Sequence, residues 1–300
     1  MISWYNNIGD VMLIVIPAYN PDYHLIKTLK SLKSKLNNNI LVVNDGSDIS
    51  KNDIFEEAKE YATVICHDVN KGKGRAMKTA LQYIKDNNID EDGVVFVDAD
   101  GQHKAKDVKR MIDSFYKNKD SLILGVRVFN SSHVPFKSKM GNKITIFIFR
   151  LFTHKYISDT QTGLRAISTK YIPFLLKVEG NRYEYEMNML IDTVNKKINI
   201  VEVPIETVYE DKKNSTSHFK VFRDSYLIYK KFLKFALSSF SSSVVDYIAF
   251  LIFLSIFGSS TSMMFLSNIL ARLISGTVNY FINKKLIFKH KDKNNSALQY

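Results

Sequence analysis

Short apolar runs alternate with amphipathic stretches through the first two-thirds of the chain, and this alternation limits the folds open to it. Strands that alternate with helices form a mainly parallel sheet, because parallel neighbours need a crossover connection. The sequence therefore predicts an α/β fold in which the polar residues that follow the strands gather at one edge of the sheet. The predicted elements lie at 12–17, 25–36, 40–43, 53–61, 62–66, 75–87, 94–97, 105–117 and 121–125.

Two carboxylates, Asp98 and Asp100, follow the apolar run 93–97. Inside such a run a carboxylate would be costly, but at the carboxyl edge of a parallel sheet it is solvated and faces the crevice where α/β folds bind ligands. Two hard oxygen ligands at this place suit Mg²⁺ or Mn²⁺ carrying a diphosphate. An isolated Asp-X-Asp is also common in plain polar loops, so the neighbouring strand ends decide between the two interpretations.

Polar residues at other strand ends favour a ligand site. Asp45 follows the strand at 40–43 and is placed to hydrogen-bond a nucleoside base or ribose. Lys71 and Lys73 lie in a glycine-containing turn at a helix start, where phosphate binds well. Such turns are often only helix starts, so the pattern has weight only together with Asp98 and Asp100.

The chain resembles the family-2 glycosyltransferases with a GT-A fold. Four motifs match that family in order and spacing, at residues 15–20, 43–47, 70–74 and 98–103. Within the family the chain looks most like the dolichol-phosphate mannose synthase branch, which loads sugars onto polyprenyl phosphates. The resemblance implies a Rossmann-like catalytic domain, a nucleotide-diphosphate sugar donor and a polyprenyl phosphate acceptor.

The resemblance also implies a donor site and a metal site. Asp98 and Asp100 would hold Mg²⁺ or Mn²⁺. One departure concerns the first motif, where family members often have Glu after the Asn and this chain has Pro21 and Asp22. Whether Asp22 replaces that contact stays open. The donor-side residues are Pro17, Tyr19, Asn20, Asp22, Asp45, Lys73, Asp98, Gln102 and His218.

A second group of residues is assigned to the reaction centre and the acceptor. Arg127 matches the arginine that this branch uses near the acceptor phosphate, although a solvated surface arginine is the alternative. Asp159 opens a second family signature, at 159–166, and is the candidate for orienting acceptor or sugar. Arg165 in that signature is assigned to the acceptor side or to holding the loop. The predicted catalytic set is therefore Asp100, Asp159 and Arg127.

Two further acceptor-half features carry alternatives. Glu184 either faces the sugar hydroxyls or only complements a helix dipole. The segment at about 136–153 is basic and then apolar, and it is shorter than the roughly 20 residues that cross a bilayer. It is interpreted as one or two amphipathic helices in the headgroup layer, with Lys139 and Lys143 toward anionic lipid or the acceptor phosphate. A buried core helix is the alternative.

The C-terminal part of the chain predicts a membrane hairpin. Apolar stretches at 236–257 and 262–282 are joined by a short polar loop and flanked at both outer ends by lysines. The positive-inside rule places both ends, and with them the catalytic domain, in the cytosol of a two-span membrane protein. Asp246 and Arg272 lie at equal depth in the two spans, which favours an ion pair because either charge alone is costly in lipid.

The stretch at 235–289 resembles the first half of a GtrA-like domain, which normally has four spans. The chain is therefore either truncated or reduced to its hairpin. The expected organisation is an N-terminal extension at 1–11, a GT-A domain at 12–224 and a juxtamembrane helix with two spans at 225–300. An oligomer through the hairpin is open.

Composition fits this interpretation. The net charge of +12 favours anionic partners, and because the basic residues concentrate in membrane-adjacent segments, nucleic acid is not expected. The single cysteine, Cys66, is expected to be a buried strand residue.

Together, the motifs and the resemblance predict a metal-dependent, inverting transfer of a hexose from UDP-glucose or GDP-mannose type donors to a polyprenyl phosphate. The rivals are transfer to a lipid or polysaccharide hydroxyl, and a non-catalytic membrane protein that binds sugar nucleotides or lipid.

Overall fold

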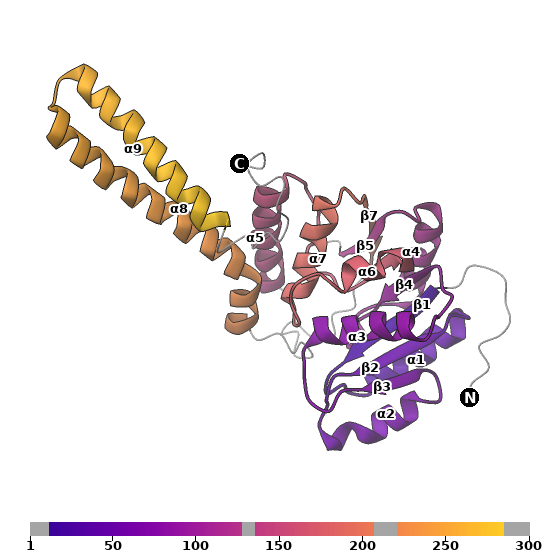
Figure 1. The fold of residues 1–300 in the computed structure, drawn as a ribbon. Helices are drawn as coiled ribbons and strands as arrows, with labels where there is room; N and C mark the ends of the chain where they lie inside the picture. The colour runs from indigo at the N-terminus through magenta and orange to yellow at the C-terminus, as the bar shows by residue number, and fades with distance from the viewer. Residues whose placement is uncertain (1–11, 128–135, 207–220, 285–300) are drawn as a thin grey trace. The chain divides into compact units, whose positions relative to one another are not determined.

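The computed structural model describes residues 12–127, 136–206 and 221–284. Of residues 136–139, 221–232 and 235 it describes only the backbone. The chain divides into two compact units, Met1–Asp224 and Ser225–Tyr300, and each is described by itself (Figure 1). The expected N-terminal extension at 1–11 and His218 lie outside the described residues.

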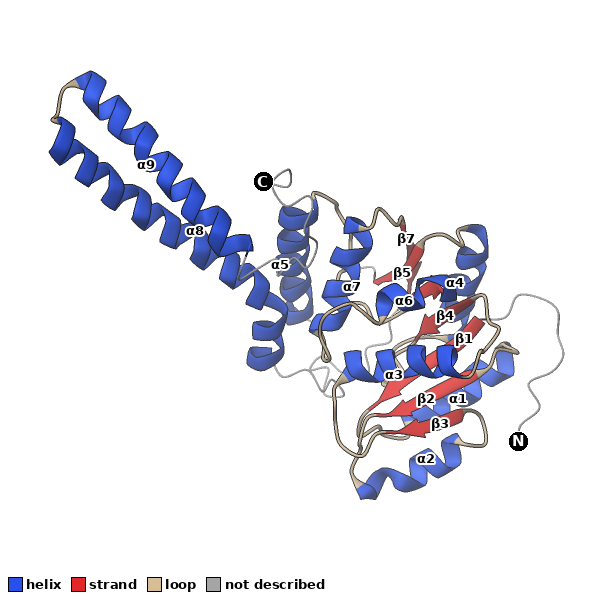
Figure 2. Ribbon diagram, viewed as in Figure 1, coloured by secondary structure: helices blue, strands red, loops and turns tan. Residues whose placement is uncertain are grey.

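The first unit is built on a seven-stranded mixed sheet with the order β3-β2-β1-β4-β6-β5-β7 (Figure 2). All neighbouring pairs are parallel except the two that involve β6. This confirms the predicted α/β fold. The strands are β1 (Met12–Ala18), β2 (Ile40–Asn44), β3 (Thr63–Cys66), β4 (Gly93–Phe96), β5 (Leu122–Arg127), β6 (Arg165–Ser168) and β7 (Ile200–Ile205).

Helices cover both faces of this sheet. α1, α2 and α4 share one apolar core with the strands, while α3 packs on the opposite face together with α6 and α7 (Figure 2). α5 packs against α7. The helices of this unit are α1 (His24–Lys35), α2 (Asn52–Ala58), α3 (Lys73–Asp86), α4 (Ala105–Lys117), α5 (Phe136–Thr153), α6 (Ile172–Leu175) and α7 (Glu184–Asn195), with short 3₁₀ turns at Ile49–Lys51 and Thr169–Tyr171.

The central strands are apolar throughout because both of their faces are covered. Every residue of β1, β2 and β4 is buried. Strands of parallel sheets have this continuous apolar character, whereas strands with one solvated face alternate. Polar side chains can therefore begin only where these strands end. The carboxyl ends of β1, β2, β4 and β5 share one edge of the sheet, since β4 and β5 both run antiparallel to β6.

Strand β6 is the element that the sequence does not reveal. It runs antiparallel between β4 and β5, with Phe96 opposite Arg165. The start of β6 therefore lies beside the end of β4, so the loop that precedes Arg165 reaches the same edge as Asp98. This reversed strand brings the second family signature, 159–166, to the first one.

The expectation that Cys66 is buried is wrong. Cys66 ends β3 and is exposed. β3 pairs only with β2 and forms one edge of the sheet, so it lacks the cover that buries the central strands. A short apolar run alone does not distinguish an edge strand from a central one.

Glu91 is a buried carboxyl in the turn before β4. It is 6% exposed, Oε1 accepts a hydrogen bond from Asn39 Nδ2 at 3.2 Å, and Oε2 has no partner among the described residues. Burial raises the pKa of Glu91 from 4.5 to about 7, and the charges of Asp92 and Asp90 act in the same direction. The folded protein therefore favours the protonated acid.

Glu91→Gln is expected to stabilise the protein in a pH-dependent way. The folded carboxyl keeps its proton up to about pH 7, while the unfolded one loses it near 4.5, so the ionised form penalises folding increasingly across that interval and fully above it. The amide should raise the free energy of unfolding by about 1–3 kcal/mol at about pH 8 and leave it unchanged near pH 4. Urea unfolding at both pH values measures this, and an equal gain at both would contradict it.

The second unit is a helical hairpin formed by α8 (Val221–Phe257), from Ser225 onward, and α9 (Thr261–Ile282). Small and polar residues are buried between the two helices, while large apolar residues point outward and are exposed. Such an arrangement is typical of helices that pack in lipid, where small residues allow close approach and polar side chains bond across the interface. The buried residues are Ser238, Ser242, Ala249, Ser267, Ala271, Ser275 and Asn283.

Specific polar contacts join the hairpin. Ser238 Oγ donates to Asn279 Oδ1 at 3.1 Å, and Ser275 Oγ donates to Asp246 Oδ1 at 2.9 Å. Arg272 Nη1 lies 3.6 Å from Asp246 Oδ2, which confirms the predicted pairing. Among the described helices, the segment Ala236–Phe257 is long and apolar enough to cross a membrane.

Candidate active site

A charged cluster lies where β4 ends. Asp98 Oδ1 is 2.6 Å from Lys73 Nζ, and Asp98 Oδ2 is 3.2 Å from His103 Nε2. Lys73 also reaches Glu186 Oε1 at 2.9 Å, so one ammonium group bridges two carboxylates from distant parts of the chain. Burial alone would raise the pKa of Asp98, but Lys73 and His103 hold it far below its ordinary value. The pKa of Lys73 is raised in turn, so both groups are charged.

Asp100 lies at the same strand end in a different electrostatic setting. Its Oδ1 accepts a hydrogen bond from the Gln102 backbone at 3.1 Å. Burial and the negative charge of Asp98 raise the pKa of Asp100. A divalent cation would relieve this unfavourable charge, so the donor set fits a hard cation with oxygen ligands.

The described residues alone do not provide a full cation cage in this region. Within the described residues no three Asp, Glu, His or Cys side chains converge on one point. Mg²⁺ is usually bound through one or two carboxylates together with substrate phosphates and water. Asp98 and Asp100 match that mode of binding, in which the substrate completes the coordination.

Gly163 allows the second signature to approach Asp98. A Cβ atom built on Gly163 would lie 2.2 Å from Asp98 Oδ2 and 2.4 Å from Oδ1. Real Cβ atoms do not come this close, so any side chain here must displace the carboxylate. The glycine of the motif is therefore required by the close packing of the backbone against the Asp98 carboxylate.

Gly163→Ala is expected to lower any activity that depends on Asp98 by about 10- to 100-fold, because displacing a functional group by about an ångström has an effect of this order. The circular dichroism spectrum should not change. Gly141→Ala is the matched control, since its Cβ would meet Gln161 only at an ordinary 3.5 Å. Equal activity of the two variants would show that the contact with Asp98 has no catalytic importance.

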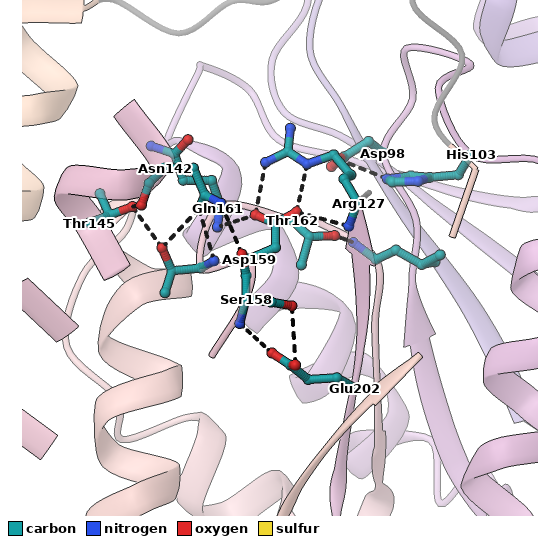
Figure 3. Close-up of polar contacts among 12 residues, drawn as sticks. Asp98, His103, Arg127, Asn142, Thr145, Ser158, Asp159, Gln161, Thr162 and Glu202 are labelled. Carbon is teal, nitrogen blue, oxygen red and sulfur yellow. Dashed lines mark hydrogen bonds and ion pairs between the residues drawn. The ribbon is translucent and has the colours of Figure 1, made fainter. Parts of the chain in front are cut away.

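Arg127 and Asp159 form a second polar feature at the end of β5 (Figure 3). Asp159 Oδ2 accepts from Arg127 Nε at 2.6 Å, and Oδ1 accepts from Nη2 at 2.9 Å. The guanidinium is thus held by a bidentate pair, the strong and directional form of this interaction. The Arg127 side chain is 14% exposed, whereas that of Asp159 is fully buried. Asp159 therefore fixes the orientation of the Arg127 guanidinium, and its predicted contact with acceptor or sugar stays a prediction.

The loop that carries Asp159 is held on both sides. Ser158 donates from its backbone nitrogen and its hydroxyl to the Glu202 carboxylate of β7, at 2.6 and 3.1 Å. The Thr160 backbone nitrogen donates to Asn142 Oδ1 of α5 at 3.1 Å. The loop is therefore fixed by two elements that are distant in sequence, as Figure 3 shows.

Asp45 is bonded entirely within the protein. It is 2% exposed, and each of its oxygens accepts two hydrogen bonds. A carboxylate has about four acceptor sites, and all four are used here. Asp45 thus organises the turn that precedes Lys73, and its predicted contact with a nucleoside stays a prediction. Its partners are His67 Nδ1 (2.7 Å), Asn70 Nδ2 (3.1 Å) and the backbone nitrogens of Lys71 (2.9 Å) and Gly72 (2.8 Å).

The first motif forms the end of β1. Pro17 is buried in the strand. Asn20 has a positive φ of 45°, which asparagine tolerates, and its side chain bonds Asp48 of the next loop through Nδ2 at 2.7 Å and Oδ1 at 2.7 Å. Asp22 accepts from His24 Nδ1 at 2.6 Å and is exposed. Tyr19 is partly buried at the same edge. The donor roles of these residues stay predictions.

The structure gives a different role to Arg165 than direct acceptor contact. Arg165 is fully buried, with Nε donating to the Thr162 carbonyl at 3.0 Å and Nη1 to the Glu186 carbonyl at 2.6 Å. It therefore holds the loop, the second of the two roles that the sequence allows. Lys143 is exposed on α5. The side chain of Lys139, like His218, lies outside the described residues.

Sequence reasoning alone does not single out His103 and Glu186 for the site. Glu186 is 7% exposed and faces Lys73, whereas Glu184 accepts hydrogen bonds from the backbone of Asn181 and Arg182 at 3.0 and 3.3 Å. Glu184 is thus part of a helix start. Glu184 and Glu186 lie on different sides of α7. Only the position of α3, which carries Lys73, shows that Glu186 is the one that meets the lysine.

Comparisons with known proteins agree with this geometry. The family described as "Glycosyl transferase family 2" matches residues 13–175, and "GtrA/DPMS, transmembrane domain" matches residues 219–300. The UDP-N-acetylglucosamine–dolichyl-phosphate N-acetylglucosaminyltransferase of Methanococcus voltae is 30% identical over 67% of this chain and 87% of that protein. The dolichyl-phosphate beta-glucosyltransferase of Saccharomyces cerevisiae is 28% identical over 64% of this chain and 65% of that protein.

A solved structure shares the fold. The glucosyl-3-phosphoglycerate synthase of Mycobacterium tuberculosis, in complex with Mn²⁺, UDP and phosphoglyceric acid, aligns with a TM-score of 0.53 at 17% identity, over 68% of this chain and 72% of that one. At this identity the likeness shows the GT-A fold alone. The family match extends over more than half of the chain and includes the ends of β1, β2, β4 and β5. The chain therefore belongs to glycosyl transferase family 2 and carries a GtrA/DPMS transmembrane domain at its C-terminal end.

Proposed function

We propose that this enzyme transfers a sugar from a nucleotide-diphosphate donor to a polyprenyl phosphate at the cytosolic membrane face, with inversion at the anomeric carbon. The single observation that carries the proposal is the presence of two separate electrostatic features at one sheet edge. The Asp98/Asp100 pair suits a metal-bound diphosphate, and the oriented guanidinium of Arg127 suits a second anion. An acceptor with its own phosphate explains why both are present.

A phosphate acceptor also removes the need for a general base. The second pKa of a phosphate monoester is about 6, so much of it is already dianionic near neutral pH. Mg²⁺ or Mn²⁺ held by Asp98 and Asp100 would neutralise the charge of the departing diphosphate. The residues of this chain then have two tasks, to align the acceptor oxygen with the anomeric carbon and to stabilise charge. A single in-line displacement gives inversion.

The sugar is proposed to be a hexose, with UDP-glucose or GDP-mannose as the type of donor. The yeast relative is named for glucosyl transfer and the Methanococcus voltae relative for N-acetylglucosaminyl transfer. We therefore include N-acetylglucosamine as the first competing donor sugar in the test below. The metal is proposed to be required for each donor.

Helix α5 is proposed to lie in the headgroup layer. Its exposed face carries Met140, Ile144, Phe147 and Leu151, at helical spacing and between 47% and 66% exposed. A large apolar stripe of this kind on a soluble surface marks an interaction site, and a chain with a transmembrane domain supplies the bilayer as its partner. The exposed Lys143 would then meet anionic lipid or the acceptor phosphate.

The hairpin is proposed to cross the membrane twice, with its Asp246–Arg272 pair near the middle. Reversing the charge of either residue alone should lower the amount of folded protein in the membrane, because it leaves two like charges in lipid. Asp246→Arg combined with Arg272→Asp should restore it. Membrane fractionation and thermal aggregation measure this, and a double variant as poor as the single ones would argue against the pair.

The function is tested with the full-length protein in vesicles. The vesicles contain undecaprenyl or dolichyl phosphate, and labelled UDP-glucose, GDP-mannose and UDP-N-acetylglucosamine are offered in turn with Mn²⁺ or Mg²⁺. We expect label in the lipid fraction from one donor, only when both lipid phosphate and metal are present. Binding of a donor without any transfer would support the non-catalytic rival, and transfer to vesicles that lack the lipid phosphate would support a hydroxyl acceptor.

A further inference from the structure

We propose that Asn142 and Thr145 of α5 are positioning residues for the acceptor site, because they hold the loop that orients Arg127. This inference rests on the proposed function, since it assigns Arg127 to the acceptor phosphate. Helix α5 then has a second role besides membrane contact. The helix whose outer face meets the lipid also fixes Arg127, which binds the phosphate of the lipid acceptor.

Helix α5 buries polar side chains and exposes large apolar ones, unlike a typical helix on a soluble domain. Its buried side includes Asn142, Thr145 and Phe149, which are 2%, 0% and 0% exposed. Its outer side is the apolar stripe defined above. A buried asparagine and threonine are costly unless their polar atoms are satisfied, so their partners indicate what the helix is built to hold.

Both buried polar residues bond the same loop. Asn142 Nδ2 donates to the Ser158 carbonyl at 3.1 Å, and Asn142 Oδ1 accepts from the Thr160 backbone nitrogen at 3.1 Å. The Thr160 hydroxyl donates to Thr145 Oγ1 at 2.7 Å. Asn142 therefore bonds the backbone immediately before and after Asp159, as Figure 3 shows.

Asp159 transmits this constraint to Arg127. Its carboxylate is fully buried and accepts from Arg127 Nε, Nη2 and backbone nitrogen, and from the Gln161 backbone. A bidentate pair fixes the plane of a guanidinium as well as its position. A shift of the 158–160 backbone, which Asn142 holds, must therefore move or tilt Arg127.

The test compares Asn142→Ala and Thr145→Val with Thr153→Val, all in full-length protein in vesicles. Thr153 is a matched control because its hydroxyl bonds the Phe149 carbonyl and the Lys155 backbone nitrogen, both at its own end of the helix. Steady-state kinetics are measured for a vesicle-embedded polyprenyl phosphate and for a short, water-soluble prenyl phosphate. Thr145→Val is the milder change. If Asn142→Ala does not fold, Thr145→Val still tests whether α5 positions the loop that orients Arg127.

We expect the KM for either acceptor to rise about tenfold in Asn142→Ala and severalfold in Thr145→Val. A shift of the Arg127 guanidinium away from the acceptor phosphate weakens acceptor binding by a factor of about this size. The KM for the nucleotide sugar should stay within about twofold of wild type in both. Thr153→Val should behave as wild type. Phe147→Asp, on the outer face, should impair only the vesicle-embedded acceptor, which separates loss of membrane contact from loss of positioning.

Two results would overturn the inference. One is an unchanged acceptor KM in folded Asn142→Ala and Thr145→Val. The other is an equal rise in the donor and acceptor KM values, which would indicate a general structural role. If the wild-type protein itself transfers no sugar to either lipid phosphate, the proposed function fails instead, so the two failures are distinguishable.

Discussion

Asp100→Asn is expected to lower sugar transfer by about a thousandfold or more, the scale of losing a principal electrostatic contribution at a reaction centre. Asparagine keeps the size of the side chain and its hydrogen bond from the Gln102 backbone but removes the charge that would hold the cation. Initial rates at saturating donor and increasing Mn²⁺ measure the effect. Asp113→Asn, an exposed change on α4, is the matched control and should leave the rate unchanged.

The same variant should be more stable than wild type when no metal is added. Burial and the charge of Asp98 raise the pKa of Asp100, so its ionised form disfavours the folded state and the neutral amide removes that penalty. A higher Tm together with lost activity is a typical trade-off at an active site. The contrary result is that Asp100→Asn keeps more than about a tenth of wild-type activity, far above the residual activity expected after such a loss. In that case Asp100 is not a metal ligand in catalysis.

Arg127→Ala is expected to lower kcat/KM for the lipid acceptor by about 100- to 1,000-fold, in the range measured when one oriented charge-stabilising donor is lost. Arg127→Lys should recover little of this, because an ammonium group cannot make the bidentate contact with Asp159. The KM for the nucleotide sugar should change much less than that for the acceptor. Kinetics with each substrate varied in turn measure the split.

Stability distinguishes a catalytic effect from simple unfolding. Arg127→Ala leaves the fully buried Asp159 without its partner, which costs about 3–5 kcal/mol, whereas removing both charges of such a pair is often neutral. Arg127→Met with Asp159→Leu should therefore regain most of the lost stability and none of the activity. A double variant that regains activity would show that Arg127 is needed only for folding.

The sequence predicts most of the catalytic framework for a simple physical reason. Central strands of a parallel sheet must be apolar throughout, so the first polar residue after each run marks the ligand edge. That pattern correctly places Asp98 and Asp100 at the same sheet edge as Lys73. The ion pair between Asp246 and Arg272 is predictable too, because two opposite charges at the same level of an apolar hairpin have few other polar partners.

Other features depend on three-dimensional neighbours that no local pattern contains. β6 is four residues long and antiparallel, and only its pairing with β4 explains why Asp159 and Gly163 reach the site. The burial of Asp159 and the four hydrogen bonds to Asp45 depend on neighbours that are distant in sequence, although the motifs of both residues are recognisable in the sequence. Glu186 requires knowledge of which face of α7 meets α3.

Helix α5 shows the same limit in another form. Its amphipathic pattern predicts one apolar and one polar face, and on a soluble domain the apolar face would be buried. Here Asn142 and Thr145 are buried and Phe147 is exposed. The pattern alone therefore cannot assign the outward face, and the hydrogen bonds to the 158–160 loop are what assign it.

The central claim is that the acceptor is a lipid phosphate, and the chemistry of the product tests it most directly. Full-length protein in vesicles with undecaprenyl phosphate and a labelled nucleotide sugar should give a glycolipid whose sugar is joined through a single phosphate. Its anomeric configuration should be opposite to that of the donor, and mild acid should release the free sugar. A product with an acid-stable link to a hydroxyl, or one with retained configuration, would contradict the account.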